Sequence, residues 1–239
     1  MIALAYNIPG VNSEIKLPRD IYVDIFAGKI RKWDDPRIQA ANPGIALPRR
    51  DIALVARLDS SGTTAAFTSH LAAVGPTWRA AGLGVGKVIE WPAGVLLAPG
   101  NEGVAARIRL TEGSIGYVEY WFAQRLGLRM AALQNKAGSY ITPTEHSGEL
   151  ALSGRVAQVK ELAASVADPA APGAYPIATY SWMFLYGSYA NPAVSEAVRD
   201  FAQWSFSQPA QNYGAQLGYL PLSDDVIDLG KQALGALTH

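Results

Sequence analysis

The sequence predicts an α/β fold built on a mostly parallel, doubly wound sheet. Short apolar runs alternate with segments of helical spacing between Ile52 and Leu126, as expected where helices connect neighbouring strands. At 239 residues with 49% hydrophobic content, the chain is long enough for one large domain or two modest ones. We therefore expect substantial apolar cores.

Apolar runs bounded by glycine, proline and other turn residues indicate the strands, and apolar residues three or four positions apart indicate the helices. The expected strands are residues 2–7, 52–57, 85–90, 115–118 and 177–186. The expected helices are residues 19–27, 61–74, 102–111, 119–126, 155–166, 192–204 and 226–234. Asn101 and Asn191 are expected to be helix N-caps, and Gly28 is expected to end the first helix.

Composition excludes several classes of partner and cofactor. Twenty basic and twenty acidic residues leave no net charge, which argues against nucleic acid or an anionic membrane as a partner. The basic segment 29–36 is short and contains two aspartates, so we expect a solvated turn with Trp33 packed beneath it. The chain has no cysteine, and its three histidines are too scattered for a metal cluster. We therefore expect no metal and no cofactor.

The start of the chain is predicted to be a strand. Residues 1–7 have no basic leader and no long apolar run, so we expect neither a signal peptide nor a membrane span there. We expect the strand to start at the first residues of the sequence, without a preceding segment of the fold.

Residues 54–70 are predicted to form a strand, a tight turn and a helix, and they carry most of the chemical information. Asp59 or Ser60 is expected to cap the helix. The amides of the next three residues would then point outward without partners in the chain. Those residues are Ser61, Gly62 and Thr63. Unpaired amides, hydroxyls and the positive end of a helix dipole together predict a site for a small oxyanion.

Arg57 leaves the predicted strand beside this turn. Its planar guanidinium can hold two anion oxygens at once, and Asp59 can orient it. An ordinary Ser/Thr-capped helix with a surface ion pair between Arg57 and Asp59 fits the local pattern equally well. No Gly-Lys-Ser/Thr follows the turn, so this is not a nucleotide-binding P-loop.

Three motifs resemble those of the phosphate-binding proteins of bacterial phosphate ABC transporters, and they occur in the same order as in that family. They are RLDSSGTT at 57–64, GNEGVA at 100–105 and GSIGYVEY at 113–120. Shorter similarities at 28–35, 91–92 and 217–222 extend the likeness from about residue 4 to residue 235. The resemblance implies a periplasmic-binding-protein fold of type II, in which two lobes joined by hinge strands bury phosphate between them. It also implies an ABC permease in the membrane as partner and a periplasmic or cell-surface location.

The same resemblance assigns the ligand-binding residues. The family's phosphate-binding arginine falls on Arg57 and its paired aspartate on Asp59. The hydroxyl and amide donors fall on Ser61, Gly62 and Thr63, and no catalytic residue is implied. Ser60 stands where many members have glycine, which a turn tolerates unless φ is positive.

The resemblance also predicts how the chain divides. Residues 8–175 are expected to form a complete lobe, and residues 1–7 and 176–239 the hinge strands and the C-terminal part of the other lobe. Family members carry a further N-terminal segment that supplies phosphate donors and a carboxylate for the phosphate's proton. Without about three such contacts, affinity would fall about 10³- to 10⁶-fold. We therefore expect weakened binding, or completion by a second copy or a strand-exchanged partner.

Alternative functions remain at this point. The scaffold could bind another oxyanion, such as sulfate or arsenate, or the chain could be a degenerate structural or interaction remnant. An enzyme with Ser61 as nucleophile is disfavoured. His70, which could act as its base, would lie two turns along the helix, and no metal set is visible.

Overall fold

The computed structural model describes residues 1–153 and 166–235. The described residues divide into two compact units. Unit 1 comprises residues 1–152 and 166–179, and unit 2 comprises residues 153 and 180–235. The helix expected over 155–166 falls, except for its last residue, outside the described residues. No helix in the described part of the chain has the length and apolar character needed to cross a membrane.

Unit 1 is built on a five-stranded sheet with the strand order β4-β3-β5-β1-β6. Its strands are β1 (Ile2–Asn7), β3 (Ala53–Arg57), β4 (Leu96–Ala98), β5 (Ser114–Glu119) and β6 (Arg129–Met130). β3 runs parallel to both β4 and β5, whereas β1 runs antiparallel to β5 and β6. The α/β class is therefore confirmed. Strands β3, β4, β5 and β6 run in one direction, so this sheet is mostly parallel as predicted, and β1 runs against them.

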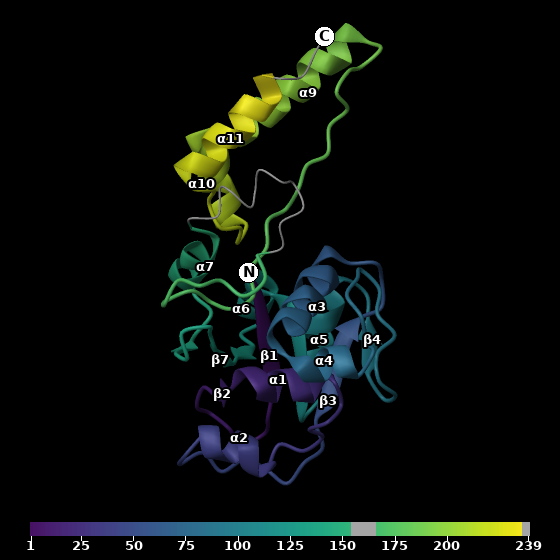
Figure 1. Ribbon diagram of the computed structural model, residues 1–239, viewed down its shortest axis with the longest axis vertical. Helices are drawn as coiled ribbons and strands as arrows, with labels where there is room; N and C mark the ends of the chain where they lie inside the picture. Colours follow the sequence, from purple (N-terminus) through teal and green to yellow (C-terminus); the bar gives the residue numbers. More distant parts are fainter. Residues whose placement is uncertain (154–165, 236–239) are drawn as a thin grey trace. The chain divides into compact units, whose positions relative to one another are not determined.

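Each face of this sheet is covered by helices, and strand alternation decides which residues face which layer. In β1, Leu4 and Tyr6 belong to the larger core and Ala5 to the smaller one. The larger core is closed by α1 (Arg19–Phe26), α3 (Gly62–Val74) and α4 (Pro76–Ala80). The smaller core is closed by α5 (Gly100–Leu110) and α6 (Tyr120–Arg125). Figure 1 shows α1, α3, α4 and α5 beside the strands of this sheet.

A second, small sheet completes unit 1. It has the order β2-β7-β8 and comprises β2 (Lys16–Leu17), β7 (Ala132–Gln134) and β8 (Tyr140–Ile141). The helices α2 (Pro36–Ala41) and α7 (Glu145–Leu152) also belong to this unit. Trp33 is fully buried below the turn that precedes α2, and its Nε1 donates to the Gly113 carbonyl oxygen at 2.8 Å. Gly28 follows α1 with φ of +73°, as predicted for a helix stop.

Two predicted strands are not formed. Residues 85–90 make individual bonds to the region around α3 instead of a ladder. The Gly86 amide donates to Thr68 Oγ1 (3.2 Å), and the Lys87 carbonyl accepts from the Ser61 amide (2.9 Å). The strand that pairs with the outer side of β3 is β4, a few residues later, and it forms one of the two edges of the sheet. Local composition favours an extended chain here, but it does not show which segment meets the sheet edge.

The prediction of a strand over residues 177–186 is also wrong. Ile177 forms an isolated bridge with Ala167, and its carbonyl accepts from the Ile2 amide at 3.0 Å. Residues 178–186 continue without a strand assignment. Aromatic residues raise β-propensity, but a strand forms only where a neighbouring strand pairs with it.

Unit 2 contains three helices within its described residues, α9 (Pro192–Ser205), α10 (Gln208–Gln216) and α11 (Asp224–Gly235). The first and last were predicted, and Asn191 caps α9 by accepting from the Ala193 amide at 3.0 Å. The sequence did not predict α10.

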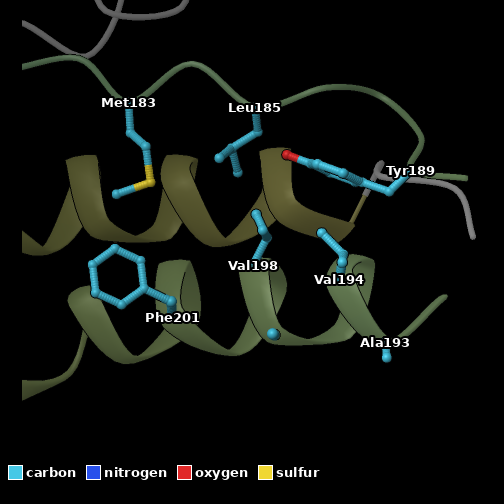
Figure 2. A pocket seen from close by; sticks show the side chains of 8 residues that line it. Met183, Leu185, Tyr189, Ala193, Val194, Val198 and Phe201 are labelled. Atoms are coloured by element: carbon cyan, nitrogen blue, oxygen red, sulfur yellow. The ribbon is translucent and has the colours of Figure 1, made fainter. Parts of the chain in front are cut away.

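Large apolar side chains of unit 2 stay exposed, among them Phe184 (88%) and Trp204 (51%). An apolar groove of about 500 Å³ lies between the segment 183–189 and α9. Figure 2 shows Met183, Leu185 and Tyr189 above the side chains of α9 that line this groove. Unit 1 buries its apolar faces in two cores, whereas much of unit 2's apolar surface remains uncovered.

Candidate anion-binding site at the start of helix α3

Helix α3 begins one or two residues later than predicted. Its N-cap is Ser61, with extended backbone angles (φ −140°, ψ 129°), and Ser61 Oγ accepts from the Thr64 amide at 3.3 Å. The prediction of Asp59 or Ser60 as the cap was wrong, because the Asp59 carboxylate is bound to Arg57. The Ser61 amide was also expected to point outward, but it donates to the Lys87 carbonyl.

The next two amides match the prediction. In the described part of the chain, neither the Gly62 nor the Thr63 amide donates a hydrogen bond, as expected for the first two residues of a helix. Gly62 is exposed, and nothing lies within 4 Å of the position that a Cβ atom would occupy there. The first turn of α3 contains no acidic residue to compensate the positive end of its dipole.

Arg57, the last residue of β3, is held beside this helix start by Asp59. Arg57 Nε donates to Asp59 Oδ1 (3.0 Å), and Nη2 donates to Oδ2 (2.5 Å). The Arg57 side chain is only 10% exposed, whereas the Asp59 side chain is 42% exposed, so the pair lies at the surface with its guanidinium largely covered. Hydrogen bonding to Asp59 raises the pKa of Arg57, whereas bonds from Arg57 and the Gly100 amide lower the pKa of Asp59 well below its usual value. The predicted contact between Asp59 and the Arg57 guanidinium is therefore present in the structure.

Tyr117 joins the end of β3 to the first turn of α3. Its hydroxyl oxygen accepts from the Arg57 amide (3.1 Å) and shares a hydrogen bond with Thr64 Oγ1 (2.7 Å). The ring is fully buried, stacks on Phe67 with centroids 4.5 Å apart, and burial raises the pKa of its hydroxyl. Sequence reasoning did not assign this residue, although it lies within the GSIGYVEY motif.

Glu119, at the end of β5, brings a carboxylate to the same helix start. Thr63 Oγ1 donates to Glu119 Oε1 at 3.1 Å, and the Glu119 amide donates to Asn101 Oδ1 at 3.3 Å. Asn101 is therefore not the cap of α5, because the helix starts at Gly100 and its N-cap is Pro99. The asparagine side chain holds the end of β5 instead. Sequence reasoning also missed Glu119 as a site residue.

Two groups considered for catalysis are engaged elsewhere. Ser61 Oγ serves as the helix cap, and His70 Nε2 is hydrogen-bonded to the Tyr22 hydroxyl at 2.8 Å. His70 is buried on α3, and this burial lowers its pKa to about 3. Among the residues that the structure describes, no three His, Cys, Asp or Glu side chains are grouped to hold a metal ion.

Four of the five predicted site residues have the local geometry that the sequence predicted. Arg57 and Asp59 form an oriented pair, and Gly62 and Thr63 offer free amides. Ser61 lies at the same place, but with its amide used and its oxygen acting as the cap. The arrangement offers hydrogen-bond donors and one guanidinium to an anion.

Comparison with known proteins identifies relatives over nearly the whole chain. Residues 1–209 match the PBP superfamily domain. The chain is 34% identical to the phosphate-binding protein PstS of Methanocaldococcus jannaschii, covering 99% of this chain and 65% of that protein. It is 36% identical to the phosphate-binding protein PstS of Pasteurella multocida, covering 92% of this chain and 64% of that protein.

The fold also resembles a solved structure of a phosphate-binding protein from Stenotrophomonas maltophilia, with a TM-score of 0.70 and 20% identity. That alignment covers 95% of this chain and 66% of the solved one. The predicted fold class is thus confirmed at the level of the family. The chain spans slightly less than two thirds of the length of the relatives it matches.

Proposed function

The chain belongs to the PBP superfamily, and we propose that it is a solute-binding protein for inorganic phosphate in ABC-type uptake. One observation carries the proposal. Helix α3 begins with the free amides of Gly62 and Thr63, and the strand that leads into it ends at Arg57, whose guanidinium is bonded by Asp59. The names of the relatives, phosphate-binding proteins, support phosphate as the anion.

The chemistry of these groups suits a tetrahedral oxyanion. A helix N-terminus supplies N–H donors and a partial positive charge, and a guanidinium adds donors in a fixed plane. Because the Arg57 side chain is mostly buried, its interaction with an anion is less screened by water than a surface contact. Tyr117 links the Arg57 backbone amide to Thr64 of α3, and Asp59 bonds the Arg57 guanidinium, so the site is partly ordered before binding, which lowers the ordering cost.

The proposal includes a place of action. A solute-binding protein for ABC-type uptake would act in the periplasm or at the cell surface, where it would deliver phosphate to a membrane permease. It would act as a carrier and not as a catalyst, and the engagement of Ser61 and His70 in other contacts supports this.

Titration calorimetry with inorganic phosphate tests the proposal. We expect saturable binding of phosphate to the wild-type chain and loss of at least about 10²-fold in affinity for Arg57→Ala, since two charge-assisted hydrogen bonds contribute about 3–6 kcal/mol. Arg31→Ala is the matched control, because Arg31 is exposed and its side chain donates from Nε to the nearby Gly28 carbonyl. Absence of phosphate binding by the wild type, or equal binding by Arg57→Ala, contradicts the proposal.

Another oxyanion is the second candidate ligand. Helix amides and a guanidinium can donate hydrogen bonds to sulfate and arsenate as well as to phosphate. Competition titrations with the two anions separate the candidates: phosphate bound more tightly than sulfate supports the proposal, and the reverse order replaces it.

The proposal extends to the division of the chain and to a partner. The sequence predicted one lobe over residues 8–175, and in the structure β1 and residues 176–179 belong to the same compact unit. We propose that unit 1 acts as one lobe and that unit 2 supplies part of the other. The exposed apolar side chains of unit 2, such as Phe184 and Trp204, support association with a second copy of the chain. Sedimentation equilibrium tests this: a dimer is expected, and a strict monomer at high concentration contradicts it.

A further inference from the structure

The segment 180–186 of unit 2 alternates in character from one residue to the next. Met183 and Leu185 line the groove beside α9, and Figure 2 shows both side chains turned toward that helix. In an extended chain, alternate side chains point to opposite sides. The positions on the other side are all aromatic, and they are Tyr180, Trp182, Phe184 and Tyr186. We call these four residues the aromatic stripe.

The aromatic stripe is mostly uncovered. Phe184 is 88% exposed and Tyr186 is 77% exposed. The ring centroids of Tyr180 and Trp182 lie 5.8 Å apart, as expected for neighbours on one side of an extended chain. A large aromatic side chain buries about 150–250 Å² when it is covered. Trp182, Phe184 and Tyr186 of two copies would together bury about 900–1,500 Å², which reaches the size of a specific protein interface.

The backbone of this segment is also available for pairing. Residues 181–185 make no backbone hydrogen bond with any other residue that the structure describes, and the next amide, that of Tyr186, donates to the Tyr189 hydroxyl at 3.2 Å. An extended chain with unpaired N–H and C=O groups can pair with a second strand. The sequence pattern of a strand is therefore present here, and what it lacks is a partner.

Charge and symmetry favour a second copy of the chain as that partner. Residues 169–195 contain no Asp, Glu, Lys, Arg or His, so two copies meet without like-charge repulsion and without the charges that normally block pairing of an exposed strand. A strongly acidic or basic partner would find no opposite charge there. In an antiparallel pair, residues opposite each other lie on the same face, so the aromatic stripes of two copies related by a two-fold axis would lie side by side.

We propose that residues 181–185 pair, as an antiparallel strand, with the same residues of a second copy of the chain. The two backbones then satisfy each other's hydrogen bonds, and the two aromatic stripes join into one face, where aromatic cross-strand pairs add stability. This inference rests on the self-association included in the proposed function, for which it names the segment and the geometry.

Hydrogen exchange of the full chain, measured below and above the concentration at which it dimerises, tests the backbone pairing. In an antiparallel pair, only every second residue exchanges both hydrogen bonds with its partner. We therefore expect alternate amides between residues 181 and 185 to exchange at least about tenfold more slowly in the dimer, and the amides of α10 to be unchanged. A dimer in which residues 181–185 exchange as fast as in the monomer overturns the proposal.

Phe184→Lys tests the aromatic stripe by sedimentation equilibrium. Because Phe184 is 88% exposed, the variant should keep the wild-type fold, which circular dichroism checks. The dimer dissociation constant should rise at least about 10²-fold, since a symmetric interface contains each substitution twice and the two lysines repel each other. Tyr213→Lys is the matched control, because Tyr213 is an aromatic residue of α10 that is 56% exposed, and it should leave this constant unchanged.

The outcomes separate this inference from the self-association on which it rests. If the wild type dimerises and Phe184→Lys dimerises equally well, or if Tyr213→Lys weakens the dimer as much, the strand pairing is wrong and the self-association stands. If the wild type remains monomeric at high concentration, both are wrong. Phosphate binding by the wild-type chain is measured separately and depends on neither result.

Discussion

Helices α3 and α5 follow the carboxyl ends of the neighbouring parallel strands β3 and β4, yet the polar groups of their first turns have different partners. Helix α3 has a serine cap, two free amides and no acidic residue in its first turn. Helix α5 follows Pro99, which provides no side-chain cap, and the amide of its first residue, Gly100, is bound to Asp59. Its first turn also contains Glu102, which compensates the positive end of the helix.

The difference shows how one helix start can build a site at another. Asp59 bonds both the Gly100 amide and the Arg57 guanidinium, and Asn101 holds the end of β5 through the Glu119 amide. The Gly100 amide and the Asn101 side chain of α5 thus bond residues that lie next to the start of α3. A free helix start becomes a candidate ligand site only where a neighbouring element fixes the charged groups beside it.

Acidification should distinguish the two helices most strongly. α3 carries buried His70, whereas the buried residues of α5 are Val104, Ala105 and Ile108. Burial lowers the pKa of His70 to about 3, below its ordinary value of 6.5. Its contribution to stability is therefore complete above pH 6.5 and is lost as the pH falls toward 3, at about 1.4 kcal/mol per pH unit within that interval.

Chemical denaturation between these pH values measures this slope. His70→Gln should be less stable at neutral pH and should lose most of the slope, and hydrogen exchange at low pH should open α3 before α5. His146→Gln is the control, because His146 is exposed. An unchanged slope in His70→Gln would show that other groups cause the acid sensitivity.

Removal of the Tyr117 hydroxyl tests how far the sheet, which carries Tyr117 on β5, supports the start of α3. Tyr117→Phe leaves the buried Thr64 hydroxyl and the Arg57 amide without this partner, and should lower the free energy of unfolding by about 1–3 kcal/mol. Phosphate affinity should fall as well, since Arg57 and α3 lose their link. Tyr213→Phe, at a side chain that is 56% exposed, should change neither quantity. A fall in stability with full phosphate affinity would limit Tyr117 to a purely structural role.

The sequence predicted the parts of the site that are local and missed those that depend on tertiary contact. Arg57, Asp59 and the glycine of the turn lie within six positions of one another, so their proximity follows from a strand followed by a helix. The sequence indicated both a helix cap and a contact with Arg57 for Asp59, and in the structure its carboxylate makes the contact while Ser61 caps the helix. Tyr117 and Glu119 meet α3 from more than 50 residues away, across the pairing of β3 with β5.

The same reason explains the errors in the fold. Strands were assigned over 85–90 and 177–186 from composition, but a ladder needs a partner that composition does not reveal. Helices fared better because their bonds are local. Asn191 followed by Pro192 marks the start of α9 without reference to the rest of the chain.

Loss of a helix cap should give a smaller effect. Ser61→Ala removes the acceptor for the Thr64 amide and should lower the free energy of unfolding by about 1 kcal/mol. The matched variant is Ser207→Ala, which removes the same kind of cap from α10 in unit 2. Only Ser61→Ala should also weaken phosphate binding. If the two variants changed phosphate affinity equally, the Ser61 cap would have no specific role in phosphate binding.

Asn101→Ala should have the smallest effect. It removes the acceptor of the Glu119 amide without touching α3 directly, so we expect a loss of about 0.5–1.5 kcal/mol in stability and a modest change in phosphate affinity. Denaturation and calorimetry on this variant measure both. A loss of affinity as large as that of Arg57→Ala would place a ligand contact on α5 and contradict the distinction between the two helices.

The most direct test of phosphate binding at the start of α3 is a phosphate titration followed by backbone amide NMR. We predict that the Gly62 and Thr63 amide resonances move downfield and saturate together with the binding curve, while the Asn101 and Glu102 amides move little. Phosphate binding that leaves the Gly62 and Thr63 resonances unchanged would contradict the account, because the ligand would then lie elsewhere on the chain.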